Sequence, residues 1–474
     1  MQSGRARRMT VWAVLAGAFA APAGIEAKEE RSQTMGPLRV HPSNGRWFAR
    51  PDGNAVWLTG SHTWANRQER GVEGQTPDFD YEGYLAFLEK HGHNFIRLWA
   101  WEHARWMQFV PKSTPVRYKP LPYARTGPGK ARDGQPKFDL TRFDADYFQR
   151  LRRRVVAARR RGIYVAVMLF QGFSLDKTGG RKGVGNAWRG HPFHADNNVN
   201  GLDGNPSGDG TGNEVHTLKV PRVTRLQEAY VRKVIETVGD LDHVLWEISN
   251  ESHRGSVRWQ YHMIGWIRKV EAARAMQHPV GMTGAPIGAK DLRAGPADWI
   301  SPPGKKYLTD PPPADGRKVV IVDSDHCDPW GHDPVWPWKV LLRGGHFLLM
   351  DGYVDFRLHS PARPDPRWDP TRRAMGSARR LAERLDLAAL TPRGALASSG
   401  YCLAQPGRCY VAMLPAGGGR KLTVELAAGR YTLQWVEPVG GRITAGPAVL
   451  SKGGKTALTS PLDPPAVAVL RAAR

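Results

Sequence analysis

The sequence contains few cysteines, which limits the covalent cross-links that the chain can form. Among 474 residues there are three, and three cysteines cannot all pair with one another. Cys402 and Cys409 flank LAQPGR, a turn-like stretch between short strands, so a hairpin disulfide between them is feasible in an oxidising compartment. Cys327 has no second cysteine at zinc-ligand spacing, and a buried thiol is the commoner outcome for such a residue.

Long apolar runs are missing after the N-terminus. The first 30 residues contain three arginines, an apolar run that starts at Val11, and then small residues followed by charges. This order is typical of a secretory signal peptide, which we predict over residues 1–27, with the mature chain starting between Ala21 and Lys28. No later stretch approaches the roughly 18 apolar residues of a membrane span. The sequence therefore predicts a secreted or periplasmic protein without a membrane span.

Acidic residues are scarce as well. Lys and Arg number 68 and Asp and Glu 44, which gives a net charge of +24. One interpretation is attraction to an acidic partner, such as a uronate-rich polysaccharide, an anionic envelope surface or nucleic acid. The other is a set of arginines on solvated helix faces, as in QRLRRRVVAARRRG at residues 149–162. Export and the many aromatic residues argue against nucleic acid.

Strands alternate with amphipathic helices over most of the chain. In 143–161, for example, Tyr147, Leu151 and Val155 form an apolar stripe, Gly162 ends the helix, and IYVAVMLFQ follows as a buried strand. Such alternation implies parallel pairing of the strands. Eight strands close a (β/α)8 TIM barrel, and we expect them near residues 55, 95, 163, 243, 280, 298, 319 and 346.

The pattern changes near residue 391, where short strands with Gly and Pro turns begin. We therefore predict an α/β barrel domain over 37–390 and a small all-β sandwich domain over 391–474. The loop 174–220 follows the third barrel strand and is unusually long. A loop of this length over the carboxyl face of a barrel is usually functional.

Polar residues gather where the barrel strands are expected to end, which is where reacting groups lie in this fold. Two carboxylates among tryptophans are what glycoside hydrolysis needs, because one carboxylic acid protonates the leaving oxygen while the other attacks the anomeric carbon or activates water. The residues at these strand ends are His62, Trp64, Asn66, Arg97, Trp99, Trp101, Glu102, Gln171, Asn250, Glu251, Asp323, Asp325, His326 and Asp351.

Two further segments contribute candidates for sugar binding. Trp330, Trp336 and Trp338 are interleaved with Asp, Pro and Gly, which predicts an exposed loop whose indoles stack on sugar rings, whereas core packing is the alternative for each single tryptophan. In HPFHADNN, His194 and Asn198 are expected to contact substrate hydroxyls or to make hydrogen bonds within the loop, rather than to bind a metal.

The segment LWEISNES at 245–252 resembles the strand-four signature of clan A glycoside hydrolases, which are retaining (β/α)8 enzymes. The resemblance implies that Glu251 is the acid/base and that Asn250 binds the substrate 2-hydroxyl. FIRLW at 95–99 is similar to the strand-two ending of that clan, which implies that Arg97 supports the nucleophile. With NGRWFARPDGNAVWLTGSHTW at 44–64 and GRYTLQWVEPVGG at 429–441, the chain also resembles cellulase-like bacterial barrels that carry a C-terminal domain of the collagen-binding-like type.

The sequence departs from the clan at strand seven. KVVIVDSDHC has Asp323 where the clan has a glutamate nucleophile, and aspartate is shorter by roughly 1.5 Å. If the strand continues, Asp323 and Asp325 share a face, so either of them is a candidate for the second carboxylate. Carboxyl groups roughly 5–5.5 Å apart give retention, and roughly 6.5–9.5 Å gives inversion. Glu247, a reserve candidate, is expected to point into the barrel or to pair with a basic residue.

Taken together, the sequence predicts an exported glycosidase of the (β/α)8 class that uses a pair of carboxylates, with retention as the expected outcome and with no cofactor and no metal. Its substrate is expected to be a poly- or oligosaccharide. The basic charge favours acidic glycans. The alternatives are a catalytically silent carbohydrate-binding or envelope-surface protein on the same barrel, and a metal-dependent hydrolase. The catalytic candidates are Glu251, Asp323 and Asp325, and the candidates for substrate binding are Asn250, Arg97, His62, Trp64, Trp101, Gln171, His194, Asn198, His326, Trp330 and Asp351.

Overall fold

The structure is a computed structural model, and it describes most of the chain after the N-terminal segment. Residues 2–27 of the predicted signal peptide, Trp330 and the side chain of Cys327 lie outside the described part. Within that part, no helix has the length and apolar character needed to cross a membrane. The described residues are 1, 35–72, 76–106, 115–178, 186–304, 309–327, 333–351, 353, 364–417 and 419–473.

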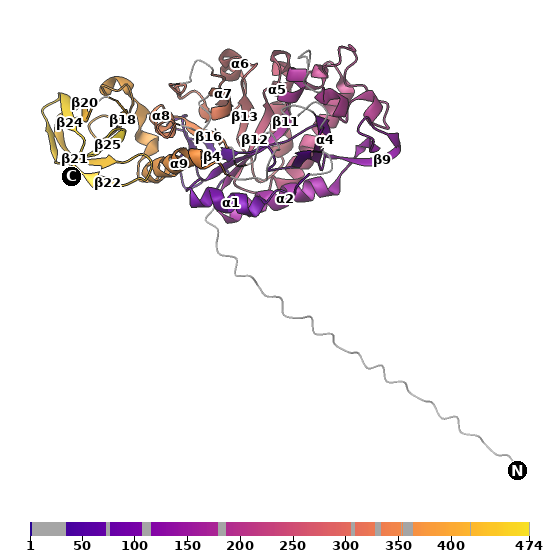
Figure 1. The fold of residues 1–474 in the computed structure, drawn as a ribbon, viewed down its shortest axis with the longest axis horizontal. Helices are drawn as coiled ribbons and strands as arrows, with labels where there is room; N and C mark the ends of the chain where they lie inside the picture. The colour runs from indigo at the N-terminus through magenta and orange to yellow at the C-terminus, as the bar shows by residue number, and fades with distance from the viewer. Residues whose placement is uncertain are drawn as a thin grey trace. The chain divides into compact units, whose positions relative to one another are not determined.

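Eight parallel strands form a closed barrel, which confirms the predicted fold (Figure 1). The strands are short and almost entirely buried, because helices cover them outside and packed side chains fill the interior. Closure brings the last strand beside the first, with Met350 opposite His62. In chain order the strands are β4 Thr59–His62, β6 Phe95–Leu98, β11 Tyr164–Gln171, β12 Val244–Asn250, β13 Val280–Thr283, β14 Trp299–Ser301, β15 Val319–Asp323 and β16 His346–Met350.

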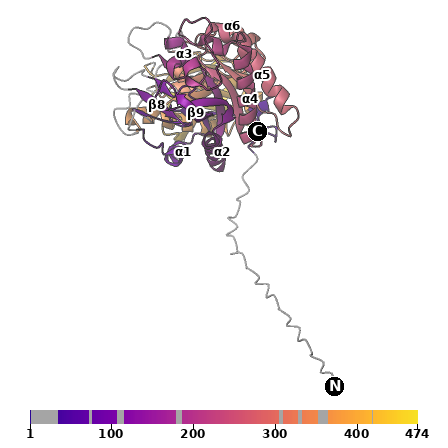
Figure 2. The same cartoon turned by 90° about the vertical axis from the view of Figure 1, so that its right-hand side faces the viewer.

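Amphipathic helices surround the barrel, as the second view shows for α1, α2, α4 and α5 (Figure 2). Helix α2 begins after Asp144, whose carboxylate caps it by accepting from the N–H of Tyr147, and its predicted apolar stripe is buried. The helices are α1 Tyr81–Lys90, α2 Ala145–Arg160, α3 Phe173–Thr178, α4 Pro221–Val238, α5 Val257–Glu271, α6 Ala289–Ala294, α7 Ser324–Cys327, α8 Trp336–Leu342 and α9 Asp369–Ala382.

The first barrel strand lies later in the chain than the sequence predicts. Residues Ala55–Val56 form β3, which pairs with β2, Phe48–Ala49, across the expected PDGN turn, and β1, Arg39–Val40, completes this small sheet. The barrel strand β4 starts at Thr59, whose N–H donates to Asn94 Oδ1 at 2.9 Å. The apolar run 55–59 is therefore divided between β3 and β4. His62 is the last residue of the barrel strand instead of following it.

The long connections at the carboxyl face contain structure of their own, which the alternation of strands and helices does not predict. After β4 and β6 the chain forms two small antiparallel sheets, and the loop after β11 forms 3-10 turns. These elements are β5 Glu69–Val72, β7 Arg105–Trp106, β8 Val116–Lys119, β9 Tyr123–Lys130, β10 Pro136–Phe143, η1 Ala187–Gly190, η2 Ala195–Asn197 and η3 Asn213–His216.

The C-terminal strands form two antiparallel sheets that enclose their own apolar core, in agreement with a β-rich domain after the barrel. One sheet packs against the barrel side, where Trp338 of α8 donates its indole N–H to the carbonyl of Pro438 at 3.1 Å. The likeness to collagen-binding-like domains stays a prediction. The strands are β17 Thr391–Pro392, β18 Cys402–Gln405, β19 Cys409–Leu414, β20 Lys421–Leu426, β21 Gly429–Val436, β22 Ile443–Ala445, β23 Val449–Ser451, β24 Gly454–Thr459 and β25 Ala466–Ala472.

Two expectations are wrong for reasons of local geometry. Cys402 and Cys409 are both free, because Cys402 pairs with Ala412 in the hairpin while Cys409 pairs with Gln405, so the two thiols project from opposite faces of the sheet. The second concerns the tryptophans after strand seven. Trp336 and Trp338 do not stand on an exposed loop but belong to α8 and are buried in the main core.

Candidate active site

Arg97 of β6 joins three barrel strands at the carboxyl end of the barrel interior. It is 1% exposed and donates to Glu247 through both Nε, at 2.7 Å, and NH2. NH1 donates to Asp323 Oδ2 at 2.9 Å, and NH2 also donates to Asn250 Oδ1 at 3.0 Å. Thr283 hydroxyl, which the sequence reasoning did not single out, donates to Glu247 at 2.8 Å. Glu247 thus points inward and pairs with a basic residue, as expected.

Asp323, the last residue of β15, is held on every side. Its Oδ2 accepts from Arg97, and its Oδ1 accepts the N–H of Asp325 at 3.0 Å and lies 3.2 Å from His62 Nε2. Burial raises the pKa of Asp323, but His62, His326 and Arg97 outweigh burial and hold that pKa well below its ordinary value. Burial lowers the pKa of His62. Asp323 is therefore an ionised carboxylate whose oxygens are occupied by protein groups.

Asp325 does not share a face with Asp323, because the strand does not continue. Strand β15 ends at Asp323 and the short helix α7 starts at Ser324, whose hydroxyl accepts the N–H of Met350 at 2.9 Å. The helical turn directs Asp325 toward Glu251 at the end of β12. The expectation that Asp323 and Asp325 share a face required the strand to continue, and this requirement is not met.

Glu251, Asp325 and His326 form a cluster in which one ligand atom from each lies within 4.8 Å of the others. Glu251 is 9% exposed and has φ +48°, a left-handed conformation that non-glycine residues rarely adopt. His326 Nε2 lies 3.3 Å from Glu251 Oε1. Backbone strain of this kind persists only where the surroundings enforce it, and it is common at functional sites.

The charged groups of this cluster shift one another's pKa values. Burial raises the pKa of Asp325 to about 7, with His326 opposing the shift and the carboxylates of Asp323 and Glu251 adding to it. Burial opposes protonation of His326, but Glu251, Asp323 and Asp325 raise its pKa to about 9. At neutral pH the cluster therefore combines a protonated imidazole with a carboxyl that readily gains or loses a proton.

Several buried donors near these carboxylates make no hydrogen bond with any described residue. They are Asn250 Nδ2, Gln171 Nε2 and both ring nitrogens of His326, whose contact with Glu251 has an ion-pair distance without hydrogen-bond geometry. Gln171 lies opposite Asn250 in the pairing of β11 with β12, so these two amides are neighbours. Unpaired buried donors are costly in a folded protein, and a bound ligand can satisfy them.

Other predicted site residues serve the fold in this structure. Both oxygens of Asp351 accept from Arg372, at 2.9 and 2.5 Å. Trp64 and Trp101 are buried and pack edge to face, with the indole N–H of Trp101 donating to the carbonyl of Trp64 at 2.8 Å. These three side chains therefore face protein atoms.

The loop residues follow the second of the two predicted roles. Asn198 is buried and its amide donates to the carbonyls of Pro192, His194 and Leu202. His194 Nδ1 accepts the N–H of Asp196 at 3.1 Å. Both residues thus make hydrogen bonds within the loop. The structure consequently brings together Glu251, Asp323, Asp325, Asn250, Arg97, His62, Gln171 and His326. The side chains of Asp351, Trp64, Trp101, His194 and Asn198 make the protein contacts given above.

Comparisons with known proteins agree with the barrel. Residues 103–287, which include Glu251 but not Asp323, match a family described as a domain of unknown function, DUF6298. No curated protein matches the chain. A solved structure described as a glycoside hydrolase is 11% identical, with a TM-score of 0.59 over 93% of this chain and 98% of that one. A glycoside hydrolase family 5 structure from Bacteroides vulgatus ATCC 8482 is 12% identical, with a TM-score of 0.59 over 93% and 94%. These likenesses concern the fold, which is a barrel shared with glycoside hydrolases.

Proposed function

We propose that the protein is an exported glycoside hydrolase that cleaves an O-glycosidic bond of a poly- or oligosaccharide with a pair of carboxylates. The observation that carries the proposal is the approach of Glu251 and Asp325, whose oxygens lie within 4.8 Å of each other where β12 and β15 end. Reacting groups of (β/α)8 enzymes lie at this face. Retaining glycosidases place their carboxyl groups about 5–5.5 Å apart, so we expect retention of anomeric configuration.

Asp325 suits the role of nucleophile better than Asp323. The oxygens of Asp323 are occupied by Arg97, His62 and a backbone N–H, whereas Asp325 is half-buried beside Glu251. A carboxylate with occupied oxygens attacks poorly, because attack would break its hydrogen bonds. Asp323 would instead fix Arg97 and the start of α7, and so position Asp325.

The reaction follows from these positions. The carboxylate of Asp325 attacks the anomeric carbon while the carboxylic acid of Glu251 protonates the departing glycosidic oxygen, which leaves a glycosyl ester and an ionised Glu251. Glu251 then removes a proton from water, the water oxygen bonds to the anomeric carbon, and Asp325 departs as a carboxylate. Asn250 Nδ2, which lacks a partner among the described residues, can donate to a sugar hydroxyl.

The raised pKa of Asp325 makes the reverse assignment of the two roles the nearest alternative. A carboxyl with a pKa of about 7 is suited to be the acid, in which case Glu251 is the nucleophile. Azide separates the two assignments. In an acid/base variant, azide attacks the glycosyl-enzyme and gives a product of retained configuration, whereas in a nucleophile variant it attacks the substrate directly and inverts it.

The test is hydrolysis of a panel of aryl glycosides and of neutral and uronate-containing polysaccharides, with the anomeric configuration followed by NMR. We expect retention, a loss of roughly 10²–10⁴-fold in kcat for Glu251→Ala with unactivated substrates, and formation of a glycosyl azide of retained configuration. Faster hydrolysis of uronate-containing substrates would support the acidic preference that the net charge of +24 suggests. Binding of sugars without turnover would instead favour the catalytically silent carbohydrate-binding protein.

The export part of the proposal rests on residues 1–27 of the sequence. Expression with the full N-terminus in a bacterial host should deliver the protein to the periplasm or medium, with an N-terminal residue between Ala21 and Lys28. Retention of Met1 in the cytoplasmic fraction would contradict it.

A metal-dependent hydrolase is the second candidate, because Glu251, Asp325 and His326 offer three ligand atoms within 4.8 Å and the ring nitrogens of His326 make no hydrogen bond with described residues. Elemental analysis of the purified protein and activity after chelation test this candidate. Stoichiometric metal together with loss of activity on chelation would favour it over the carboxylate mechanism.

A further inference from the structure

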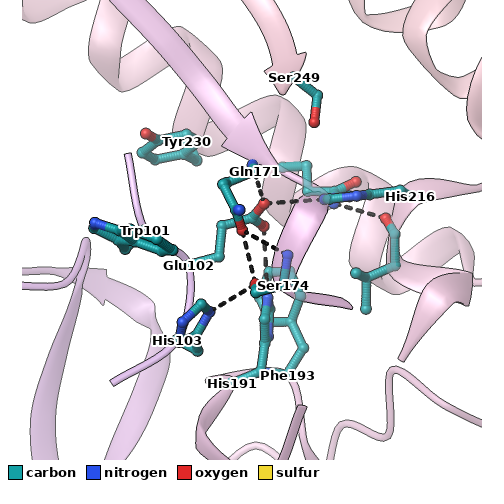
Figure 3. A network of polar contacts seen from close by, with 12 residues as sticks. Trp101, Glu102, His103, Gln171, Ser174, His191, Phe193, His216, Tyr230 and Ser249 are labelled. Atoms are coloured by element: carbon teal, nitrogen blue, oxygen red, sulfur yellow. Dashed lines mark hydrogen bonds and ion pairs between the residues drawn. The ribbon is translucent and has the colours of Figure 1, made fainter. Parts of the chain in front are cut away.

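A second buried network lies beside the proposed catalytic pair and is centred on Glu102, which follows β6 (Figure 3). Glu102 Oε1 accepts the N–H of Gln171 at 2.6 Å and lies 3.0 Å from His216 Nε2. Its Oε2 lies 3.5 Å from His191 Nε2. Burial raises the pKa of Glu102, but His216 and His191 outweigh burial and hold it well below its ordinary value. Glu102 is thus a charged residue whose contacts attach His191 and His216 of the long loop to β11.

His216 connects Glu102 to the end of β12. Its Nδ1 lies 3.1 Å from Ser252 Oγ, which in turn lies 2.6 Å from Ser249 Oγ. The imidazole also stacks on Trp259, with ring centroids 4.4 Å apart and an interplanar angle of 18°. His216, Ser249 and Ser252 are fully buried. The ring nitrogens of His216 therefore have fixed partners on opposite sides.

Ser252 directly follows Glu251, the residue with left-handed backbone. Gly172 packs against Ser252 so closely that a Cβ on Gly172 would lie 2.3 Å from Ser252 Cα, and the N–H of Gly172 donates to the carbonyl of Asn250 at 2.8 Å. Both neighbours of Glu251 are thus held in place, Asn250 through its backbone carbonyl and Ser252 through its hydroxyl. Such clamping can hold a conformation that costs of order 1–3 kcal/mol.

The order Glu102, His216, Ser252 resembles a relay that activates a serine nucleophile, but the surroundings argue against that role. Ser252 has no exposed surface, and its hydroxyl is also engaged with Ser249. The cavity beside Glu102 has a volume of about 20 Å³, which is enough for a water molecule and not for a substrate. The network therefore acts on the backbone next to it.

We propose that Glu102, acting through His216 and Ser252, is a positioning residue that holds Glu251 in its left-handed conformation and so aims its carboxyl group at the leaving oxygen. This inference rests on the proposed function for its catalytic consequence. Its structural part, the conformation of Glu251, stands without it.

Two measurements test the two parts separately, on wild type, Glu102→Gln, Ser252→Ala and a matched control. The control is Glu271→Gln, which disrupts another buried histidine–glutamate pair, with His278, at the opposite end of β12. Crystal structures of the four proteins should show a changed backbone at Glu251 and a changed distance from Glu251 to His326 in the first two variants only. An unchanged Glu251 in both of those variants would overturn the proposal.

Kinetics then measure the consequence with two substrates that differ in their need for an acid. A misplaced Glu251 should slow glycosides with poor leaving groups by roughly 10–100-fold in kcat, whereas dinitrophenyl glycosides, which depart without protonation, should change less than about 3-fold in their first step. Equal losses on both substrates, or the same selective loss in Glu271→Gln, would refute the positioning role. If no substrate is cleaved by the wild type while the crystal structures behave as expected, the proposed function fails and the structural inference stands.

Discussion

The two ends of strand β12 each border a buried pair of histidine and glutamate, and the pairs differ in what surrounds them. At the start of the strand, Glu271 accepts from the indole of Trp246 at 2.8 Å and from the N–H of His278 at 3.0 Å, and lies 2.6 Å from Nδ1 of His278. Nε2 of His278 lies 3.2 Å from the carbonyl of Leu241. Every polar side-chain atom of this group has a partner.

At the other end, the pair of Glu102 and His216 adjoins an incomplete network. The amide nitrogens of Asn250 and Gln171 have no partner among the described residues, and Glu251 has φ +48°. A closed network stabilises the fold, whereas unpaired donors beside a strained carboxylate leave room for a ligand. The difference agrees with the division of labour in (β/α)8 barrels, in which the amino-terminal face serves stability and the carboxyl face serves chemistry.

The largest effect is expected at the open end, from Asp325→Asn. Loss of the proposed nucleophile should lower kcat by roughly 10³-fold or more, because the amide cannot form the glycosyl ester. The free energy of unfolding near neutral pH should stay the same or rise, since the amide replaces a carboxyl that the fold disfavours in its charged form. Activity assays and urea unfolding check both parts, and full activity of Asp325→Asn would return the nucleophile role to Asp323.

Asp323→Asn should behave differently, although it lies two residues away. Arg97 would lose one of its charged partners inside the barrel, which typically costs about 3–5 kcal/mol. We therefore expect a large loss of stability in chemical unfolding, together with lower activity. A variant as stable as the wild type would show that Asp323 does not hold Arg97 in place.

Glu271→Gln tests the closed end. The substitution weakens charge-assisted hydrogen bonds to His278 and should lower the free energy of unfolding by about 1–3 kcal/mol. The activity per folded molecule should not change, because the pair lies at the face remote from the proposed reaction. A loss of kcat per folded molecule in Glu271→Gln would show that both ends of β12 affect catalysis, and would contradict the proposed difference between them.

Gly172→Ala tests the close approach that clamps Ser252. Because the new Cβ would lie 2.3 Å from Ser252 Cα, the backbone beside Glu251 must shift, and we expect about a 10-fold loss of kcat. Gly265→Ala is the matched control, since no atom lies within 4 Å of its added Cβ and alanine favours the helix by about 1 kcal/mol. Equal kinetics of the two variants would contradict the role of the clamp.

The smallest effect concerns the dependence of stability on pH. The folded pKa of Asp325 is raised to about 7, so its contribution to stability is present below its unfolded pKa and is lost as the pH rises through about 7. The folded pKa of His326 is raised to about 9, so its contribution is present below its unfolded pKa and is lost as the pH rises through about 9. The unfolding free energy of the wild type minus that of Asp325→Asn should therefore fall between about pH 5 and 7, because the histidines are common to both proteins. A difference that stays constant over this range would contradict the raised pKa of Asp325.

Much of the fold could be predicted because its signals are local. The apolar stripe of 143–161 and the buried run after Gly162 specify a helix and a strand through residue spacing alone, and eight such strands imply closure. The same local signal failed at 55–59, where one apolar run is divided between a hairpin and a barrel strand. It failed again at 336–342, where Pro337, a residue type that marks loops in sequence, stands in the first turn of a buried helix.

The candidate site was predictable only in part, for a related reason. Glu251, Asn250 and Arg97 follow strands directly, so their place at the carboxyl face follows from the strand count. His216 belongs to a loop about 45 residues long, and nothing in its neighbours indicates that it reaches both Glu102 and Ser252.

The sequence by itself determined the barrel, the order of its strands and the presence of two aspartates where the seventh strand ends, because spacing and polarity act along the chain. The tertiary structure decided which aspartate approaches Glu251. Arg97 and His62 lie on two other strands and contact the carboxylate oxygens of Asp323. The turn of α7 places Asp325 beside Glu251 and His326. These contacts join residues more than 200 positions apart, and only the closure of the barrel brings them within hydrogen-bond distance.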